Sequence, residues 1–165
     1  MAKVFLGLGS NIDATRHIRD ALSDLRIYFG GVQLSPVYES EAVGFAGDNF
    51  LNMVVVIDTN MDIGALHKAL RDIENKHGRD RRTPKFSGRT LDIDILMYDS
   101  CVGDFSGVTL PRDEILKNAF VLKPLCDLAP DLMHPQKNKT IAQLWLEYDK
   151  SAQKLWQVNS VATGA

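Results

Sequence analysis

Apolar residues recur along the first hundred positions with two periods, one typical of strands and one typical of helices. The helical period covers residues 18–29, where Asp13 or Thr15 is the expected N-cap. It returns over residues 63–73, where Asp62 is the expected N-cap, and a glycine closely follows each of these stretches. Four segments have the alternation or the β-branched residues of strands: 3–10, 32–40, 49–59 and 91–99.

The second half of the chain predicts a short extended piece over residues 108–111 and then two helices. The sequence AFVLKPLCDLAP predicts a helix with Pro124 in its first turn and Pro130 at its end. Thr140 and Gln143 have the spacing of a capping box, which places the start of the last helix just after Thr140.

The order of the early elements, β-α-β-β-α-β, predicts an α+β fold of the ferredoxin-like kind. In that arrangement both helices cover one face of an antiparallel sheet, and the C-terminal helices are additions to this core. We find no internal repeat or linker, so residues 1–159 are expected to form one catalytic domain. Residues 160–165 are expected to be a disordered tail.

Composition narrows the class of protein only modestly. The chain has 165 residues, 45% of them apolar, and a formal net charge of −2, which argues against a general binder of nucleic acid or of membrane surfaces. No apolar run approaches the roughly 20 residues that span a bilayer, and no signal peptide is recognisable. Cys101 and Cys126 lack metal-ligand spacing, so we expect packing roles and a reducing, cytoplasmic location.

The glycines of GLGSN, residues 7–11, resemble the start of a dinucleotide-binding loop. That fingerprint requires G-x-G-x-x-G, but position 12 is Ile, and the chain contains no P-loop motif. The simpler interpretation is that the glycines let the strand end turn beside another segment. The alternative is that Ser10 or Asn11 lines a ligand pocket.

The most unusual segment is GRTLDIDILMYDS, residues 88–100, where two carboxylates interrupt a core-like strand. Alternation along a strand puts Asp92 and Asp94 on one face with Leu96 and Tyr98. The other face is then apolar, formed by Leu91, Ile93, Ile95 and Met97. Two carboxylates about 7 Å apart repel each other unless a cation lies between them, and Mg²⁺ suits such a pair when a substrate phosphate completes its coordination.

A basic segment precedes this strand. Residues 76–89 contain six basic side chains and one acidic one, Asp80, in a chain that is otherwise acidic. Arginines make bidentate contacts with phosphate, and together with metal-binding carboxylates they indicate phosphoryl-transfer chemistry. The six basic residues are Lys76, Arg79, Arg81, Arg82, Lys85 and Arg89.

Other interpretations of these residues stay open. A cluster of arginines in a loop is often only a solvated surface, and a D-x-D pair can protect a sheet edge from aggregation. Phe50, Phe86 and Phe120 flank loops, and Asn52 shares a strand face with Phe50, which suits a clamp for a flat heterocycle. Each Phe taken singly is also a typical core residue.

These segments resemble the 6-hydroxymethyl-7,8-dihydropterin pyrophosphokinase family over most of the chain. The R-T-L-D-I-D block with its upstream G-R-D-R is the most specific element of the resemblance. The matching stretches are LGLGSN, SPVYES with VGFAGDNFLNMVV, IENKHGRDRR with GRTLDIDILMYD, and TLPRDEILKNAFVLKPLCDLAPDLMHP. The resemblance implies a ferredoxin-like enzyme of folate synthesis that transfers the β,γ-diphosphate of ATP to the pterin hydroxymethyl group and releases AMP.

The resemblance also implies roles for individual residues. Asp92 and Asp94 would hold two Mg²⁺ ions and, with Arg79 and Arg89, form the catalytic set, with Asp94 the candidate proton acceptor. The implied nucleotide contacts are Glu74, Arg79, Arg81, Arg89 and Thr109. The implied pterin contacts are the rings of Phe50 and Phe120, the edge-binding Asn52, and Ser40 and the Val43 backbone nearby.

The chain departs from the family pattern at several positions. Arg112 and Asp113 occupy the place of a His-Tyr pair, and Asn118 stands where an arginine is usual. We hypothesise that Arg112 replaces the lost cationic contact to the triphosphate. Glu41 replaces a proline and suggests a changed pterin side-chain preference.

Two alternative functions follow. The altered positions suggest a pterin- or nucleotide-binding paralogue with little turnover. The order of elements also suits an RNA-binding domain, although no strand carries the aromatic pattern of one. As an enzyme, the protein is expected to have ATP and a reduced pterin as its partners and to be a monomer or a weak homo-oligomer.

Overall fold

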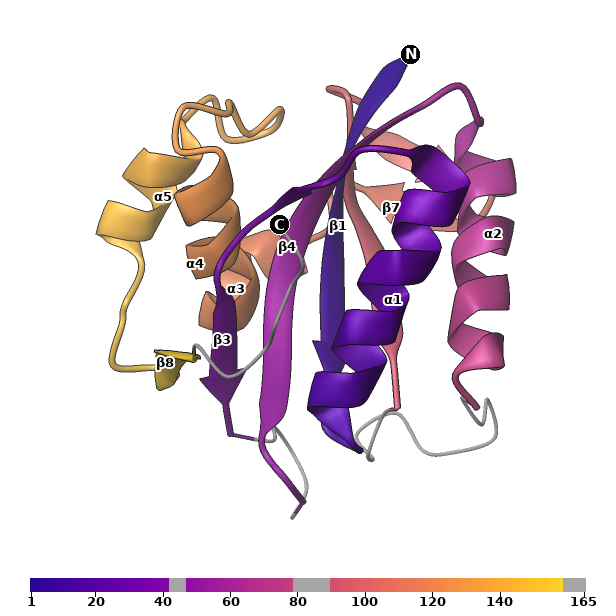
Figure 1. Cartoon of the computed structure of the whole chain (residues 1–165). Coiled ribbons are helices and arrows are strands. Elements are labelled where there is room, and N and C mark those ends of the chain that lie inside the picture. The colour runs from indigo at the N-terminus through magenta and orange to yellow at the C-terminus, as the bar shows by residue number, and fades with distance from the viewer. Residues whose placement is uncertain (42–46, 79–89, 159–165) are drawn as a thin grey trace.

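The computed structural model describes residues 1–41, 47–78 and 90–158. One antiparallel sheet forms its centre, and Figure 1 shows helices on both sides of it. β1 runs along the middle, paired with β4 on one side and β5 on the other. In spatial order the strands are β5 (Asp92–Tyr98), β1 (Ala2–Ser10), β4 (Phe50–Thr59), β3 (Val37–Ser40) and β8 (Leu155–Val158), with β2 (Gln33–Leu34) also beside β4. The predicted α+β class with an antiparallel sheet is confirmed.

α1 (Ala14–Phe29) and α2 (Ile63–Lys76) pack on the same face of this sheet (Figure 1). Their apolar stripes meet the inward side chains of the strands in one core, in which Ile18, Leu22 and Leu66 are fully buried. Asp62 caps α2 as expected, since its carboxylate accepts from the Ala65 amide at 2.8 Å. Asp13 precedes α1 as expected but makes no side-chain cap bond.

The opposite face is covered by α3 (Glu114–Lys117), α4 (Ala119–Leu128) and α5 (Ile141–Glu147). The capping box that Thr140 and Gln143 predict is present. The position predicted for Pro124 is wrong, because it is the sixth residue of α4 and lies in the helix interior. The wrong expectation came from the common preference of proline for the first turn, whereas α4 begins earlier, at Ala119.

Three further differences concern strands. The strand predicted over residues 32–40 is two strands, since Ser35 and Pro36 between them are not in strand conformation. β7 (Val108–Leu110) is present as expected, but it pairs with the unpredicted β6 (Gly103–Phe105) in a separate hairpin. β8 was not predicted either, and it adds a strand beside β3. Short strands such as these carry too few residues to show a clear period.

Cys101 packs against the α1/α2 core and Cys126 against the core on the opposite face, both as free thiols, in agreement with their expected packing roles. Among the residues that the structure describes, no helix has both the length and the apolar character needed to cross a membrane.

Candidate active site

β5 presents its two carboxylates on the face opposite α1 and α2. Leu91, Ile93 and Ile95 are buried in the core that these helices cover. Asp92 and Asp94 are half-buried and alternate with those residues, so they face the side of α3, α4 and α5. The predicted face for the aspartates is therefore confirmed up to Leu96, which lies in the core on that same side.

Beyond Leu96 the predicted alternation is wrong. Met97 packs with Leu96 on the aspartate side, and Tyr98 packs on the α1/α2 side, where its hydroxyl donates to the Met61 carbonyl at 2.6 Å. The cause is a β-bulge: Ile95 and Met97 pair with consecutive residues of β1, so Leu96 is an extra residue. The Leu96 carbonyl accepts a bond from the Arg112 amide at 2.9 Å. The bulge thus joins the end of the aspartate strand to the segment that begins with Arg112.

Gly7 and Gly9 lie inside β1, between the aspartate strand and β4, and not at a strand-end turn as predicted. Gly9 pairs with Asp92 on one side and Asn52 on the other, and Gly7 pairs with Asp94. A Cβ at Gly9 would lie 3.1 Å from the Asn52 side-chain oxygen, closer than ordinary contact. Gly9 therefore leaves no side chain between Asp92 and the Asn52 amide, whereas the Leu96 side chain covers the Gly7 position.

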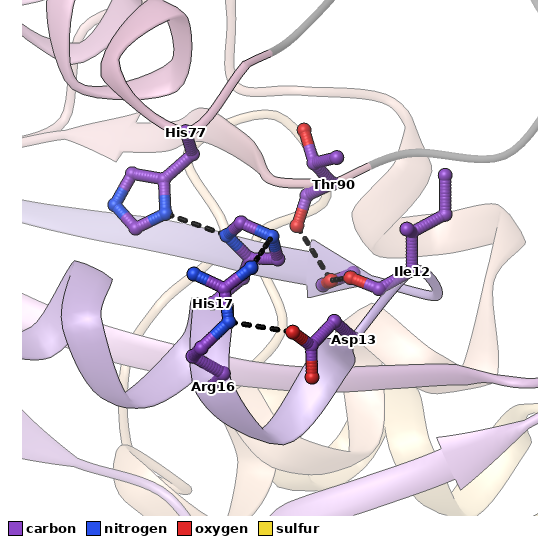
Figure 2. Close-up of polar contacts among 7 residues, drawn as sticks. Ile12, Asp13, Arg16, His17, His77 and Thr90 are labelled. Atoms are coloured by element: carbon purple, nitrogen blue, oxygen red, sulfur yellow. Dashed lines mark hydrogen bonds and ion pairs between the residues drawn. The ribbon is translucent and has the colours of Figure 1, made fainter.

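Ser10 and Asn11 are almost fully buried and bind the backbone of distant segments. The Ser10 hydroxyl donates to the Thr90 carbonyl at 2.5 Å, and the Asn11 amide donates to the Asp48 carbonyl at 3.0 Å. Thr90 is the first described residue after segment 79–89, which includes the arginines of the basic segment. Figure 2 shows Thr90 near the start of α1, beside Ile12 and Asp13. Ser10 and Asn11 thus connect the end of β1 to Thr90 and Asp48, which lie just after the undescribed segments 79–89 and 42–46.

Three of the predicted pterin residues lie close together. The Asn52 amide donates to the Ser40 hydroxyl at 3.0 Å, and both residues are buried. Phe50 shares the face of Asn52, and its ring would be 4.0 Å from a Cβ at Gly9. Phe120 lies in the first turn of α4, half-buried against the core on the same side of the sheet. Val43 lies outside the described residues.

The predicted nucleotide residues are only partly described. Glu74 is 4% exposed on α2, and its carboxylate accepts from the Ile93 amide at 2.7 Å, between the two aspartates. Thr109 is exposed on β7. Lys76, counted in the basic segment, forms an ion pair with Asp24 of α1 at 2.7 Å. The other basic residues and Phe86 lie outside the described residues: Arg79, Arg81, Arg82, Lys85 and Arg89.

Arg112 lies beside the carboxylates. The hypothesis that Arg112 contacts the triphosphate requires this position near the candidate metal ligands. Its guanidinium is 3.5 Å from an Asp94 oxygen and 3.2 Å from a Glu114 oxygen. Burial and the neighbouring Asp92 charge raise the pKa of Asp94 well above its usual range, although Arg112 opposes this rise. The site therefore has more negative charge than Arg112 offsets, which is the environment that a bound cation stabilises.

The donor set fits Mg²⁺ that is completed by substrate. No group of three or more His, Cys, Asp or Glu side chains suited to a metal occurs in the described ranges. Two carboxylates remain, and Mg²⁺ commonly uses one or two carboxylates together with water and phosphate oxygens. A closed structural metal site is therefore absent from this part of the chain, whereas an open site that requires a phosphate ligand fits the side chains present.

Sequence reasoning missed one polar contact near this site. The Gln153 side chain accepts from the Ala119 amide and donates to the Asn118 side chain, each at 2.9 Å. Gln153 lies 34 residues from Ala119, so no local pattern signals the contact. Asn118, which stands in place of the usual arginine, is thus bound to the C-terminal segment.

An antiparallel sheet with an acidic pair on one open face places the chain among α+β proteins with a candidate metal-phosphate site. The family model for 7,8-dihydro-6-hydroxymethylpterin-pyrophosphokinase (HPPK) matches residues 5–130, and the chain belongs to this family. The match includes every described residue of the candidate site, from Gly7 to Phe120.

Full-length relatives agree with this assignment. The chain is 34% identical over 145 residues to the 2-amino-4-hydroxy-6-hydroxymethyldihydropteridine pyrophosphokinase of Aquifex aeolicus, covering 87% of this chain and 90% of the relative. It is 37% identical over 141 residues to the Pseudomonas aeruginosa protein of that name, covering 81% and 84%. The folic acid synthesis protein fol1 of Schizosaccharomyces pombe is 36% identical over 84% of this chain, which spans only 19% of that longer protein.

Solved structures agree on the fold. A Plasmodium falciparum HPPK-DHPS triple mutant aligns with 89% of this chain at a TM-score of 0.73 and 16% identity, and the chain covers 43% of it. The wild-type P. falciparum protein aligns with the same share at a TM-score of 0.70 and 14% identity, with 44% of that protein covered. At this identity the likeness concerns the fold.

Proposed function

We propose that the protein transfers the β,γ-diphosphate of ATP to the hydroxymethyl group of 6-hydroxymethyl-7,8-dihydropterin and releases AMP, in folate biosynthesis. The observation that carries this proposal is the pair Asp92 and Asp94, which lie on the sheet face where Gly9, the β1 partner of Asp92, has no side chain. This surface lies within the segment that matches the pyrophosphokinase family model.

Asp92 and Asp94 are the proposed ligands of Mg²⁺, and two ions is the number we propose. When bound, the metal neutralises charge on the phosphate oxygens of ATP. The chain's own contribution is placement, because the pairing of β5 with β1 fixes both aspartates on a rigid strand. Glu74 supports this placement, since its carboxylate binds the amide of Ile93, the residue that separates the two aspartates in β5.

Arg112 is proposed as a phosphate contact that takes the place of the family's usual residues. It is 35% exposed and already lies at the candidate metal site, 3.5 Å from Asp94. A guanidinium in this position can turn from the carboxylate to a phosphate oxygen when Mg·ATP binds, because both partners are anionic oxygens. The other proposed ATP contacts are Glu74, Arg79, Arg81, Arg89 and Thr109, with Arg79 and Arg89 also in the catalytic set.

Arg112→Ala tests this role. We expect the dissociation constant of Mg·ATP to rise about tenfold, the loss typical of a hydrogen bond to a charged group. Arg112→Lys keeps the charge without the bidentate geometry, so its dissociation constant for Mg·ATP is expected to lie between those of the wild type and Arg112→Ala. Comparable ATP affinity and turnover in Arg112→Ala would exclude the proposed contact.

The pterin is proposed to bind next to the carboxylates, on the side of β4. Phe50 and Phe120 would stack on the ring, while Asn52 would bind its polar edge, with Ser40 and the Val43 backbone nearby. The Ser40 hydroxyl accepts from the Asn52 amide, which fixes the orientation of that amide and leaves its carbonyl oxygen on the open face. Gly9 leaves room for a flat ring beside this oxygen.

The decisive measurement is AMP release from Mg·ATP in the presence and absence of the hydroxymethyl dihydropterin. The proposal expects AMP and a diphosphorylated pterin in equal amounts, and no AMP without pterin. A paralogue that only binds these ligands would show pterin or ATP affinity without AMP. That alternative rests on the altered positions Arg112, Asp113 and Asn118.

The arrangement of the core is proposed to be ferredoxin-like. The four central strands stand in the spatial order β5, β1, β4, β3, which is the order of the fourth, first, third and second strands of a β-α-β-β-α-β unit. Both helices of that unit lie on one face. A cytoplasmic location and a monomeric or weakly oligomeric state are the matching proposals for the protein in the cell.

A further inference from the structure

A chain of buried polar side chains joins α1 to the end of α2, on the face of the sheet opposite the aspartates. Nδ1 of His17 lies 2.8 Å from Nδ1 of His77, and the two residues are 6% and 9% exposed. Nε2 of His77 lies 3.2 Å from Asp24, and Nε2 of His17 lies 3.3 Å from the Arg16 guanidinium. Figure 2 shows the contacts from Arg16 through His17 to His77.

The two ends of this chain fix the direction of every hydrogen bond in it. Arg16 can only donate, so Nε2 of His17 must carry a lone pair and accept. Asp24 is an acceptor: burial opposes its ionisation, but the bonds from Lys76 and His77 lower the pKa of Asp24 below its usual value. Nε2 of His77 must therefore carry a proton and donate to Asp24.

Only one arrangement of protons then satisfies the central contact. His17, with a lone pair on Nε2, has its proton on Nδ1 and donates it to Nδ1 of His77. Both rings are neutral, each as a single tautomer. An additional proton on His77 would place two N–H groups face to face across 2.8 Å, and one on His17 would face the Arg16 guanidinium. Any protonation of the pair therefore breaks one of its contacts.

These hydrogen-bonded side chains lie at the C-terminal end of α2, where the basic segment begins. His77 is the C-cap of α2, Gly78 follows it with a φ of 77°, and Arg79 is the next residue in sequence. The return of the same segment, at Thr90, is bound by the Ser10 hydroxyl at the end of β1, four residues before α1 begins at Ala14. The start and the return of the basic segment are thus both joined to the β1–α1 region (Figure 2).

We propose that the neutral His17–His77 pair is a positioning element for the end of α2, after which the proposed ATP-contacting residues follow in the sequence, and that it loses this role when either ring gains a proton. The inference rests on the proposed function, because the ATP contacts of Arg79, Arg81 and Arg89 belong to it. The pair acts through the end of α2 and does not itself contact substrate.

The surroundings of the pair agree with a neutral state. Burial, then the Arg16 charge and the neighbouring His77, lower the pKa of His17 below its usual 6.5, while Asp13 and Asp20 oppose this shift more weakly. Since the folded-state pKa of His17 is lowered, the contacts of neutral His17 contribute fully above pH 6.5 and lose their contribution as the pH falls below that value. The remaining charged groups in the adjacent groove of about 470 Å³ are Asp24 and Lys76, which pair with each other.

Variants at His17 separate a positioning role from a merely structural one. In His17→Asn, the side-chain amide can donate to neutral His77 or turn over and accept from protonated His77, so it tolerates both states. His17→Ala removes the contact at every pH. Asp72→Asn, which alters an exposed carboxylate of α2 paired only with Lys68 among the described residues, is the matched control.

The test measures the dissociation constant of Mg²⁺ with a non-hydrolysable ATP analogue from about pH 5 to about pH 8, the range over which histidine titrates. For the wild type and Asp72→Asn we expect affinity to fall about fivefold below pH 6, the equivalent of one lost hydrogen bond. His17→Asn should lack this fall. His17→Ala should be weakened to a similar extent at every pH.

Nitrogen NMR of the two rings in the full-length protein provides a readout independent of ATP. Above pH 7 we expect His17 protonated at Nδ1 alone and His77 at Nε2 alone. Other tautomers, or a wild-type pH profile equal to that of His17→Asn, would overturn the proposal. If the tautomers are as expected but the wild type binds ATP and releases no AMP, the proposed function fails while the positioning inference still stands on the affinity profile.

Discussion

The two faces of the central sheet are built for different purposes. The face under α1 and α2 is largely apolar, and side chains that fill it, such as Leu6, Ile18 and Leu66, are fully buried. The opposite face is apolar only where α4 and α5 cover it, around Phe5, Val54 and Leu125. Towards the end of β1 and the start of β5 it carries glycines and carboxylates in place of apolar residues.

The difference shows where stability is given up for chemistry. The pKa of Asp94 is raised because burial and Asp92 disfavour its charge, so the ionised carboxylate costs folding free energy at neutral pH. Among the described residues, the hydrophobic cluster under α1 and α2 consists of apolar side chains, and the buried carboxylates beside it, Glu74 and Asp24, accept hydrogen bonds from the Ile93 amide and from Lys76. Substitutions on the two faces should therefore have opposite signatures.

The largest expected effect comes from Asp94→Ala. We expect loss of AMP release on the order of a thousandfold, because several kcal/mol of charge stabilisation at the phosphates would be lost. The melting temperature should stay the same or rise, since a carboxylate that is unfavourable in the folded state is removed. Asp92→Ala is expected to match it in activity.

Leu22→Ala, on the other face, is the matched comparison. Leu22 is fully buried between α1 and the sheet, so its truncation should lower the free energy of unfolding by about 3 kcal/mol. Turnover per folded molecule should remain close to the wild-type value. Calorimetric unfolding and AMP release measured on both variants test the contrast, and a substantially destabilised Asp94→Ala would contradict it.

Sequence alone predicted the first of these faces well, because the stripe from Ile18 to Phe29 and the stripe from Ile63 to Ile73 have a clear helical period. It also placed Asp92 and Asp94 on the correct face. It failed after Leu96, because a bulge changes the alternation without any signature in the residue types.

The sequence proposed which residues form the candidate site, but it did not predict the contacts between them. The motif resemblance supplied the residues, and the structure brings Ser40, Phe50 and Asn52 together beside Gly9. What the sequence could not reveal are contacts between distant segments, such as Ser10 with Thr90 or His17 with His77. Such pairs depend on the tertiary path of the chain, and single side chains at those positions carry no periodic signal.

Gly9→Ala tests whether the bare sheet surface serves the pterin. A methyl group there would lie 3.1 Å from the Asn52 oxygen and would have to displace it. We expect pterin affinity to fall about tenfold, the range of a small steric conflict, with little change in ATP affinity. The loss of stability should be small, since the lower unfolded-state entropy of alanine offsets part of the cost of moving Asn52.

Gly31→Ala is the control for this substitution, because no atom lies within 4 Å of its Cβ position. Pterin binding, followed by the fluorescence of the ligand, should be unchanged in the control. Equal pterin affinity in Gly9→Ala and the wild type would show that the surface beside Asn52 does not contact the ligand.

The smallest expected effect concerns the C-terminal segment, which braces the aspartate-facing side of the sheet from outside. Gln153 accepts from the Ala119 amide at 2.9 Å and so caps α4 from a distance of 34 residues in sequence. The N-cap residue itself, Asn118, makes no cap bond and is held by the other end of the Gln153 amide. β8 then continues the segment along β3, pairing Leu155 with Ser40.

Gln153→Ala should therefore cost about 1 kcal/mol of stability, the usual value of a lost helix cap. Because Phe120 follows Ala119 directly, we also expect weaker pterin binding of about twofold to threefold, with ATP affinity unchanged. Gln153→Glu retains the acceptor for the Ala119 amide but not the donor to Asn118, so it should restore most of the stability. Denaturant unfolding and pterin titration of the wild type, Gln153→Ala and Gln153→Glu separate the two contacts. If Gln153→Glu were as destabilised as Gln153→Ala, the bond to Asn118, and not the cap of Ala119, would be the contact that stabilises α4.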